Sequence, residues 1–269
     1  AMFAHDMLLA GSADVIVAGG MESMTNAPHL LPKGRSGIRI GHGQIFDHMM
    51  LDGLEDAYEA GRSMGTFGED CAAKYNFTRE AQDKFATASV ERAQVAIKTG
   101  AFLAEITPVT VKGRAGDTII SIDEGPGKIK LDKIAGLRAA FKKDGTITAA
   151  SSSSINDGAA ALVMMRQSTA DKSGVKPMAR IVSHATHAQE PNWFATAPLG
   201  ATQTALAKAG WTAKDVQLWE INEAFAVVPM ALMTELSLSH EIVNVNGGAC
   251  ALGHPIGASG ARIIVTLIH

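Results

Sequence analysis

The chain has 269 residues, of which 46% are hydrophobic and 19% charged, which is the balance of a globular protein and excludes a disordered one. A net charge of −3 without a dense Lys/Arg run excludes a nucleic-acid surface, and no apolar stretch is long enough to span a bilayer. Only two cysteines, Cys71 and Cys250, are present, which favours a reducing, cytoplasmic location. Nine histidines lack any paired-ligand spacing, so the sequence predicts no metal.

The first 20 residues predict the end of a helix followed by a strand. Residues 1–11 have the pattern of a helix end with Gly11 as its C-cap, and residues 13–20 that of a short strand buried on both faces. The helix lacks an N-cap, and the last residues, 263–269, form an apolar run. We therefore expect the natural domain to extend beyond both ends.

The middle of the chain, residues 24–155, differs in composition and begins with many glycines, histidines, prolines and charged residues. It predicts, in chain order, helices near 46–61 and 78–99 and short strands at 106–111 and 118–122. Thr78 is the expected N-cap of the second helix. This segment has the character of an insertion.

The alternation of strand and helix resumes at Asn156. Strands are expected at 156–165, 179–184 and 215–221, and helices at 199–209, 223–236 and 257–268. Such alternation is typical of a layered α/β protein.

The strongest chemical signal is His254, which lies between Gly253 and Pro255 in a glycine-rich segment that precedes a helix. Pro255 disfavours helical geometry at His254, and a histidine held on a rigid turn is well suited to act as a general base. The alternative is a buried structural histidine in a tight turn.

A second signal is Asn222, which falls where a predicted strand meets a predicted helix. Open α/β sheets present functional side chains at such strand ends. An asparagine there orients a water or donates to a developing oxyanion. The alternative role is the N-cap of the helix expected from Glu223.

Four blocks carry a family resemblance: AGGMESM (18–24), GTITA with NDGAAAL (145–149 and 156–162), NEAFA (222–226) and NGGACALGHPIGASGARI (246–263). In this order, over essentially the whole chain, they resemble the thiolase family. The resemblance implies the layered αβαβα thiolase fold, truncated at both ends, with an inserted α+β loop domain. It assigns 1–23 to the N-terminal core, 24–155 to the loop domain, 156–176 to the returning core and 177–269 to an incomplete C-terminal domain.

The resemblance implies an acyltransferase whose substrates are coenzyme A thioesters and which needs no other cofactor. GHGQIFDHM (41–49) and LDGLEDA (51–57) favour the biosynthetic branch, an acetyl-CoA C-acetyltransferase that condenses two acetyl-CoA to acetoacetyl-CoA and CoA. A degradative 3-ketoacyl-CoA thiolase and a non-catalytic acyl-CoA-binding homologue are the alternatives. The resemblance also implies a homo-oligomer, either a dimer or a tetramer.

The family assigns His254 to activation of a nucleophilic cysteine and to an oxyanion hole, and Asn222 to holding a water. Its CoA contacts fall on mostly small or apolar residues, as in a pantetheine channel. These are Leu54, Ser63, Met64, Phe141, Ala149, Ser153, Ile155, Phe194, Ala224 and Phe225. Relatives often carry a histidine where this chain has Ser63.

The family's two active-site cysteines occupy Cys-x-Ser-Gly and Cys-Ile-Gly-Gly-Gly turns, and neither turn occurs in this sequence. We interpret Cys71 and Cys250 as small buried hydrophobic residues. We therefore expect the 269-residue chain by itself to have no thiolytic activity. We also expect it to expose apolar surface.

Overall fold

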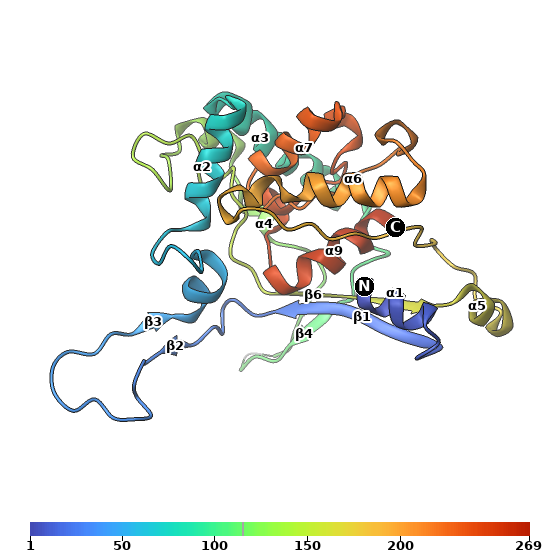
Figure 1. Cartoon of the computed structure of the whole chain (residues 1–269), viewed down its shortest axis with the longest axis horizontal. Coiled ribbons are helices and arrows are strands. Elements are labelled where there is room, and N and C mark those ends of the chain that lie inside the picture. Colours follow the sequence, from blue (N-terminus) through green and yellow to red (C-terminus); the bar gives the residue numbers. More distant parts are fainter. Residues whose placement is uncertain (115) are drawn as a thin grey trace.

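The computed structural model describes residues 1–114 and 116–269 (Figure 1). The α-helices are α1 (Met2–Leu9), α2 (Met64–Tyr75), α3 (Arg79–Thr99), α4 (Gly125–Lys128), α5 (Gln167–Ser173), α6 (Ala197–Ala209), α7 (Val227–Leu236), α8 (Ala249–Leu252) and α9 (Ile256–Ile268). The strands are β1 (Val15–Glu22), β2 (His29–Leu30), β3 (Phe46–Asp47), β4 (Val109–Val111), β5 (Thr118–Ile120) and β6 (Gly158–Met165). Shorter helical turns are η1 (Met50–Leu54), η2 (Leu131–Gly136), η3 (Pro191–Thr196), η4 (Ala213–Asp215) and η5 (His240–Ile242).

None of these described helices combines the length and the apolar character needed to cross a membrane. Figure 1 shows α9 between the pair formed by β1 and β6 and the group formed by α2, α3, α6 and α7. The candidate site lies where α9 begins, so the packing of this helix determines the site's position.

Strands β1 and β6 pair in antiparallel fashion, with Val15 opposite Met165 and Glu22 opposite Gly158. The segment expected to be inserted between the two strands therefore leaves the sheet at β1 and returns to it at β6. The remaining strand pairs, β2 with β3 and β4 with β5, are short antiparallel ladders within that segment.

Helices α1 and α9 cover the same face of the β1–β6 pair. Ile16 and Ala18 pack with α1, because side chains two positions apart point to the same face of a strand. Gly20 continues this face, and a Cβ atom placed on it would lie 1.8 Å from the carbonyl oxygen of Gly257 in α9. The absence of a side chain at Gly20 therefore lets the helix backbone touch the strand backbone.

The opposite face of this strand pair is exposed, contrary to the predicted strand buried on both faces. Val17, Met21 and Val163 are 71%, 79% and 68% exposed. The prediction assumed a helical layer on each face, but within the described residues α1 and α9 cover only one. The expected exposure of apolar surface is found on this sheet face and also at residues elsewhere in the chain, such as Phe3, Ile40 and Leu103.

Helix α3 matches the predicted helix at 78–99. The Thr78 hydroxyl accepts from the backbone N–H of Ala81 at 3.1 Å, and Gly100 ends the helix in a left-handed conformation at φ 78°. Its buried face packs against α8, which places α3 behind the glycine-rich segment of the site.

The predicted helix at 46–61 is confirmed only in part: this stretch contains β3 and one short π-helical turn, η1, and is irregular after it. The Asp56 carboxylate accepts from the backbone N–H groups of Tyr58 and Glu59 at 2.9 and 2.7 Å. This local turn competes with helical hydrogen bonding and ends the regular structure.

The predicted strands at 179–184 and 215–221 are also absent from the described structure, where one isolated parallel bridge joins Trp219 to Val243. Asn244 explains the second case. Its side-chain amide accepts from Ile221 N–H and donates to Ile221 C=O, both at 2.8 Å. The amide of Asn244 thus takes the place of a partner strand.

Candidate active site

His254 lies in the turn between α8 and α9, which is built by close packing of glycines. Gly253 has a φ of 91°, and a Cβ atom there would lie 2.1 Å from the Asn156 side chain. A Cβ atom on Gly158 would lie 2.7 Å from the Pro255 ring. The His254 turn therefore rests on the start of β6, and the backbone N–H of His254 donates to Ser154 C=O at 3.1 Å.

The imidazole of His254 is oriented by Ser259, one turn into α9. The Ser259 hydroxyl donates its single hydrogen to Pro255 C=O at 3.0 Å. The same oxygen lies 2.6 Å from His254 Nδ1, so it accepts the Nδ1 proton. In the neutral ring the lone pair is then on Nε2, the nitrogen available to act as a base. Ser259 has no signal of its own in the sequence beyond its place in the glycine-rich motif, so its role could not be predicted.

Asn222 lies against the ring of His254. Its Nδ2 atom is 3.4 Å from Nε2 and 3.5 Å from Nδ1, too long and too evenly shared for a strong hydrogen bond. The buried Asn222 Oδ1 finds no hydrogen-bond partner among the described residues. Asn222 is not an N-cap, because α7 begins at Val227 after Ala226. It therefore keeps polar atoms free beside the base.

Burial is the main cause that lowers the pKa of His254 below its usual value, and the positive charge of Arg262 lowers it further. A histidine with a lowered pKa is neutral at neutral pH. The ring thus has a free lone pair on Nε2 under physiological conditions, as a general base requires.

Glu223 joins the segments that carry the two site residues. It is fully buried, and its carboxylate accepts from Ser89 Oγ at 2.7 Å, Asn244 Nδ2 at 2.7 Å and the backbone N–H of Cys250 at 3.0 Å. A Cβ atom on Gly248 would lie 2.3 Å from this carboxylate. In the sequence Glu223 is only the expected start of a helix, because its hydrogen-bond partners lie far away in the chain.

Glu220 is a second buried carboxylate near the site, 5% exposed and 3.7 Å from the guanidinium of Arg262. Burial raises its pKa to about 7, against which Arg262 acts in the lowering direction. Arg262 also contributes to the lowered pKa of His254, so the same cation acts on both the carboxylate and the imidazole.

Five of the ten predicted CoA-contact residues meet in one apolar cluster. Phe225 is buried in it, and Met64, Phe141, Phe194 and Ala224 pack against it. Phe141 and Phe225 meet edge to face, with ring centroids 5.7 Å apart.

The other five predicted contacts lie outside this apolar cluster. Ser153 donates from both Oγ and its backbone N–H to Ala224 C=O, each at 3.0 Å. Ser63 precedes α2 and forms an isolated bridge with Glu55, next to Leu54 in η1. Ala149 and Ile155 are exposed in the turns before β6. The contacts described for these two residues do not join them to the cluster.

An open pocket of about 340 Å³ reaches this region. Its polar lining consists of Thr202, Glu220 and Asn222, and it includes the predicted positions Phe194 and Ala224. An apolar pocket of this size with a few polar groups has the character of a small-molecule site.

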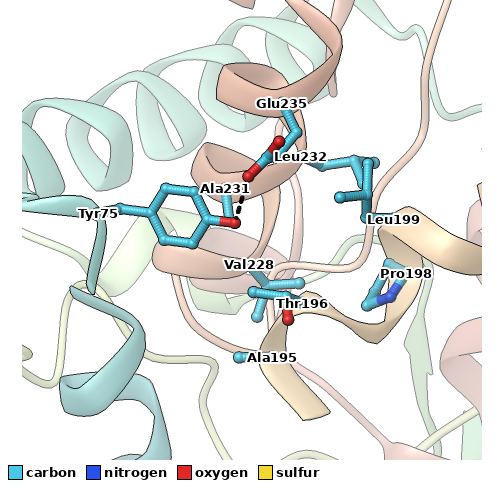
Figure 2. Close-up of a pocket in the computed structure, with 9 residues that line it drawn as sticks. All are labelled: Tyr75, Ala195, Thr196, Pro198, Leu199, Val228, Ala231, Leu232 and Glu235. Carbon is cyan, nitrogen blue, oxygen red and sulfur yellow. Dashed lines mark hydrogen bonds between the residues drawn. The ribbon is translucent and has the colours of Figure 1, made fainter. Parts of the chain in front are cut away.

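Figure 2 shows a neighbouring hollow that is lined by none of the predicted site residues. Tyr75 donates its hydroxyl to Glu235 at 2.7 Å, and burial together with this bond raises the pKa of Tyr75. The hollow leaves no volume for a ligand and shares four wall residues with the open pocket: Ala195, Pro198, Val228 and Leu232. We regard it as packing that supports the open pocket.

Both thiols of the chain are buried. Burial raises the pKa of Cys71 to about 11, and burial with the nearby Glu223 carboxylate raises that of Cys250 well above its usual value. Neither thiol is therefore a thiolate near neutral pH, which is the reactive form of cysteine.

Comparison with known proteins identifies two family domains. The family described as "Thiolase, N-terminal domain" matches residues 2–168, and "Thiolase, C-terminal domain" matches residues 175–269. The crystal structure of the Bacillus anthracis acetyl-CoA acetyltransferase superposes with a TM-score of 0.94 at 41% identity, covering 100% of this chain and 68% of that one. This similarity confirms the layered α/β thiolase fold expected from the sequence.

Several relatives are similar along the whole chain. The acetyl-CoA acetyltransferase of Chromobacterium violaceum is 50% identical over 268 residues, which are 99% of this chain and 68% of that protein. The acetyl-CoA acetyltransferase of Cupriavidus necator is 46% identical over 270 residues, covering 100% and 68%. Acetyl-CoA acetyltransferase 2 of Arabidopsis thaliana is 48% identical, covering 99% and 67%. Since both domains, the fold and nearly half of the aligned residues agree, the chain belongs to the thiolase family.

Proposed function

We propose that the natural gene product containing these residues is an acetyl-CoA C-acetyltransferase, which condenses two acetyl-CoA to acetoacetyl-CoA and CoA and catalyses the reverse thiolysis. Relatives in three organisms that are 46–50% identical to this chain bear the name acetyl-CoA acetyltransferase. The substrates would be acyl-CoA thioesters, and we propose that no further cofactor takes part.

The orientation of His254 is the observation that carries this proposal. Ser259 accepts the Nδ1 proton, so Nε2 is free to take a proton from a thiol and to return it later. The amide of Asn222 lies 3.4 Å from the same nitrogen, where it would orient a water or a thioester oxygen.

We propose that residues 24–155 form the part that covers coenzyme A, between an N-terminal core (1–23 and 156–176) and the C-terminal domain (177–269). The pairing of β1 with β6 supports an insertion, because the two strands are neighbours in space across the whole segment. The cluster around Phe225 supports an apolar channel, because Met64 and Phe141 come from this segment.

We further propose that the 269-residue chain by itself has no turnover, because both of its thiols are buried and have raised pKa values. The natural product would act in the reducing cytoplasm as a homodimer or homotetramer. The two unpaired cysteines and the exposed face of the β1–β6 pair are compatible with these assignments.

The test is cleavage of acetoacetyl-CoA by CoA, measured with the natural gene product. His254→Ala should lower kcat by about 10²–10⁴-fold, the usual contribution of a general base. His29→Ala, which removes an exposed histidine in β2, is the control and should leave kcat unchanged. A loss below about tenfold in His254→Ala would assign His254 a structural role.

Two further measurements separate the alternatives. Equal rates on 3-ketooctanoyl-CoA and acetoacetyl-CoA would identify a degradative thiolase. Binding of acetyl-CoA by the natural gene product without any turnover would identify a non-catalytic homologue. Thiolytic turnover by the 269-residue chain would contradict its proposed inactivity.

A further inference from the structure

The fold brings three potential metal ligands together at a place that the proposed reaction does not use. His5 and Asp6 are neighbours in α1, and His184 lies in the irregular segment between α5 and η3. Asp6 Oδ1 is 3.1 Å from His5 Nδ1 and 2.8 Å from His184 Nε2. The sequence predicts no metal, because these side chains come from distant segments and have no motif spacing.

Two features prepare the cluster for a ligand. The rings of His5 and His184 meet edge to face with centroids 4.9 Å apart, and each places one nitrogen within 3.1 Å of the same carboxylate oxygen of Asp6. Lys208 donates to the backbone C=O of His184 at 2.9 Å. This bond holds the backbone of His184 and does not involve its imidazole ring. The histidine side chains are 21% and 25% exposed, so an ion can reach them from solvent.

The distances fit a small divalent ion. A tetrahedral Zn²⁺ with bonds of about 2.0–2.2 Å holds its ligand atoms about 3.3–3.5 Å apart. The three ligand atoms here lie within 4.8 Å of one another. The 3.1 Å pair would widen by about 0.2–0.4 Å and the 2.8 Å pair by about 0.5–0.7 Å, while the two histidine nitrogens, at most 4.8 Å apart, would have to reach the same separation. Asp6, which is 56% exposed, has room for this movement.

We propose that His5 Nδ1, Asp6 Oδ1 and His184 Nε2 bind one borderline transition-metal cation, Zn²⁺ above all, with water completing the coordination. Imidazole nitrogens favour Zn²⁺ over Mg²⁺ or Ca²⁺, which prefer sets of oxygen ligands. Each neutral ring would present its lone pair to the ion and carry its proton on the other nitrogen, so binding releases no proton from neutral rings.

Such an ion would tie the N-terminal helix to the C-terminal half of the chain. Asp6 and His184 are 178 residues apart, so the bound metal would cross-link α1 to the segment that leads into α6. Because the site exists only when both segments are in place, metal binding should stabilise the folded chain.

The experiment uses the full 269-residue chain, purified without a polyhistidine tag and titrated with ZnCl₂ by calorimetry and equilibrium dialysis. We expect one Zn²⁺ per chain. Free Zn²⁺ at about 100 times the measured Kd should raise the Tm by about 5–10 °C. Co²⁺ should bind competitively and show the visible absorption of a four-coordinate ion.

Two variants test the proposed ligands, and a third variant is the matched control. His184→Ala and the nearly isosteric Asp6→Asn should each raise the Kd at least about tenfold, the lower range for loss of even a supporting residue. His42→Ala removes an exposed histidine elsewhere and should bind Zn²⁺ like the unmodified chain. Far-UV circular dichroism checks that each variant is folded.

Two results would overturn the proposal. Failure of the unmodified chain to bind Zn²⁺ would leave the cluster as a hydrogen-bonded contact only. An unchanged Kd in Asp6→Asn and His184→Ala would place the ion at other residues. Because the readout is metal binding, neither result depends on whether the gene product is a thiolase.

Discussion

Glu220 gives a quantitative prediction about the pH dependence of stability. This carboxylate is 5% exposed, and its Oε2 atom has no hydrogen-bond partner among the described residues. Burial raises its pKa to about 7, and the carboxylates of Glu223 and Glu105 also act in the raising direction. Replacing Glu220 with Gln keeps the shape of the side chain and removes the titration.

The sign follows from the direction of the shift. The folded chain binds the Glu220 proton more tightly than the unfolded chain, so stability is highest below the unfolded pKa of 4.5 and falls as the pH rises to about 7. The full difference corresponds to about 3 kcal/mol. Well above pH 7 the free energy of unfolding no longer changes through Glu220. The Glu220→Gln variant should lack this pH-dependent part of its stability at every pH.

Buried histidines act in the opposite direction, so the unmodified chain alone cannot isolate this effect. Burial is the main cause that lowers the pKa of His240 to about 4, with Arg92 and Lys84 contributing. The folded state therefore favours neutral His240, and its contribution is lost as the pH falls from 6.5 towards 4. The difference between Glu220→Gln and the unmodified chain cancels this background.

The assay is urea-induced unfolding at pH 5, 6, 7 and 8 for the two proteins. Relative to the unmodified chain, Glu220→Gln should gain about 2 kcal/mol of stability between pH 5 and pH 7, the part of the full difference that falls in this range. Glu91→Gln, which changes an exposed carboxylate of α3, is the control and should show a nearly constant difference. A constant difference for Glu220→Gln as well would refute the reasoning.

The remaining predictions concern Ser259 and two glycines. In the natural gene product, Ser259→Ala removes the acceptor of the His254 Nδ1 proton. It should lower kcat about 2–10-fold with KM unchanged and move the acidic limb of the pH–rate profile to lower pH. An unchanged profile would contradict the positioning role. Gly20→Ala places a Cβ atom 1.8 Å from Gly257 C=O, and overpacking of about 1–3 kcal/mol should lower the Tm of the chain by roughly 2–12 °C. Gly127→Ala, whose Cβ atom meets nothing within 4 Å, should melt within a few degrees of the unmodified chain.

Local signals determined those elements whose hydrogen bonds lie within one segment. The Thr78 cap predicted the start of α3 to within a residue, because its hydroxyl accepts from Ala81 N–H inside the helix that it begins. Four of the predicted strands are present as β1, β4, β5 and β6, but those at 179–184 and 215–221 are not, because a strand needs a partner from another segment. The segment before Ile221 has the composition of a strand, but Asn244 satisfies its backbone, and this contact spans 23 residues.

The sequence by itself determined the family, since four motifs in order need no knowledge of their arrangement in space. It also identified His254 and Asn222 as candidates, because the glycines and Pro255 around the histidine are a local pattern. Only the tertiary structure decided which nitrogen of His254 is free, which face of the β1–β6 pair is exposed, and that His184 meets Asp6. Each of these depends on contacts between side chains on separate elements, whose distances arise only when the elements pack.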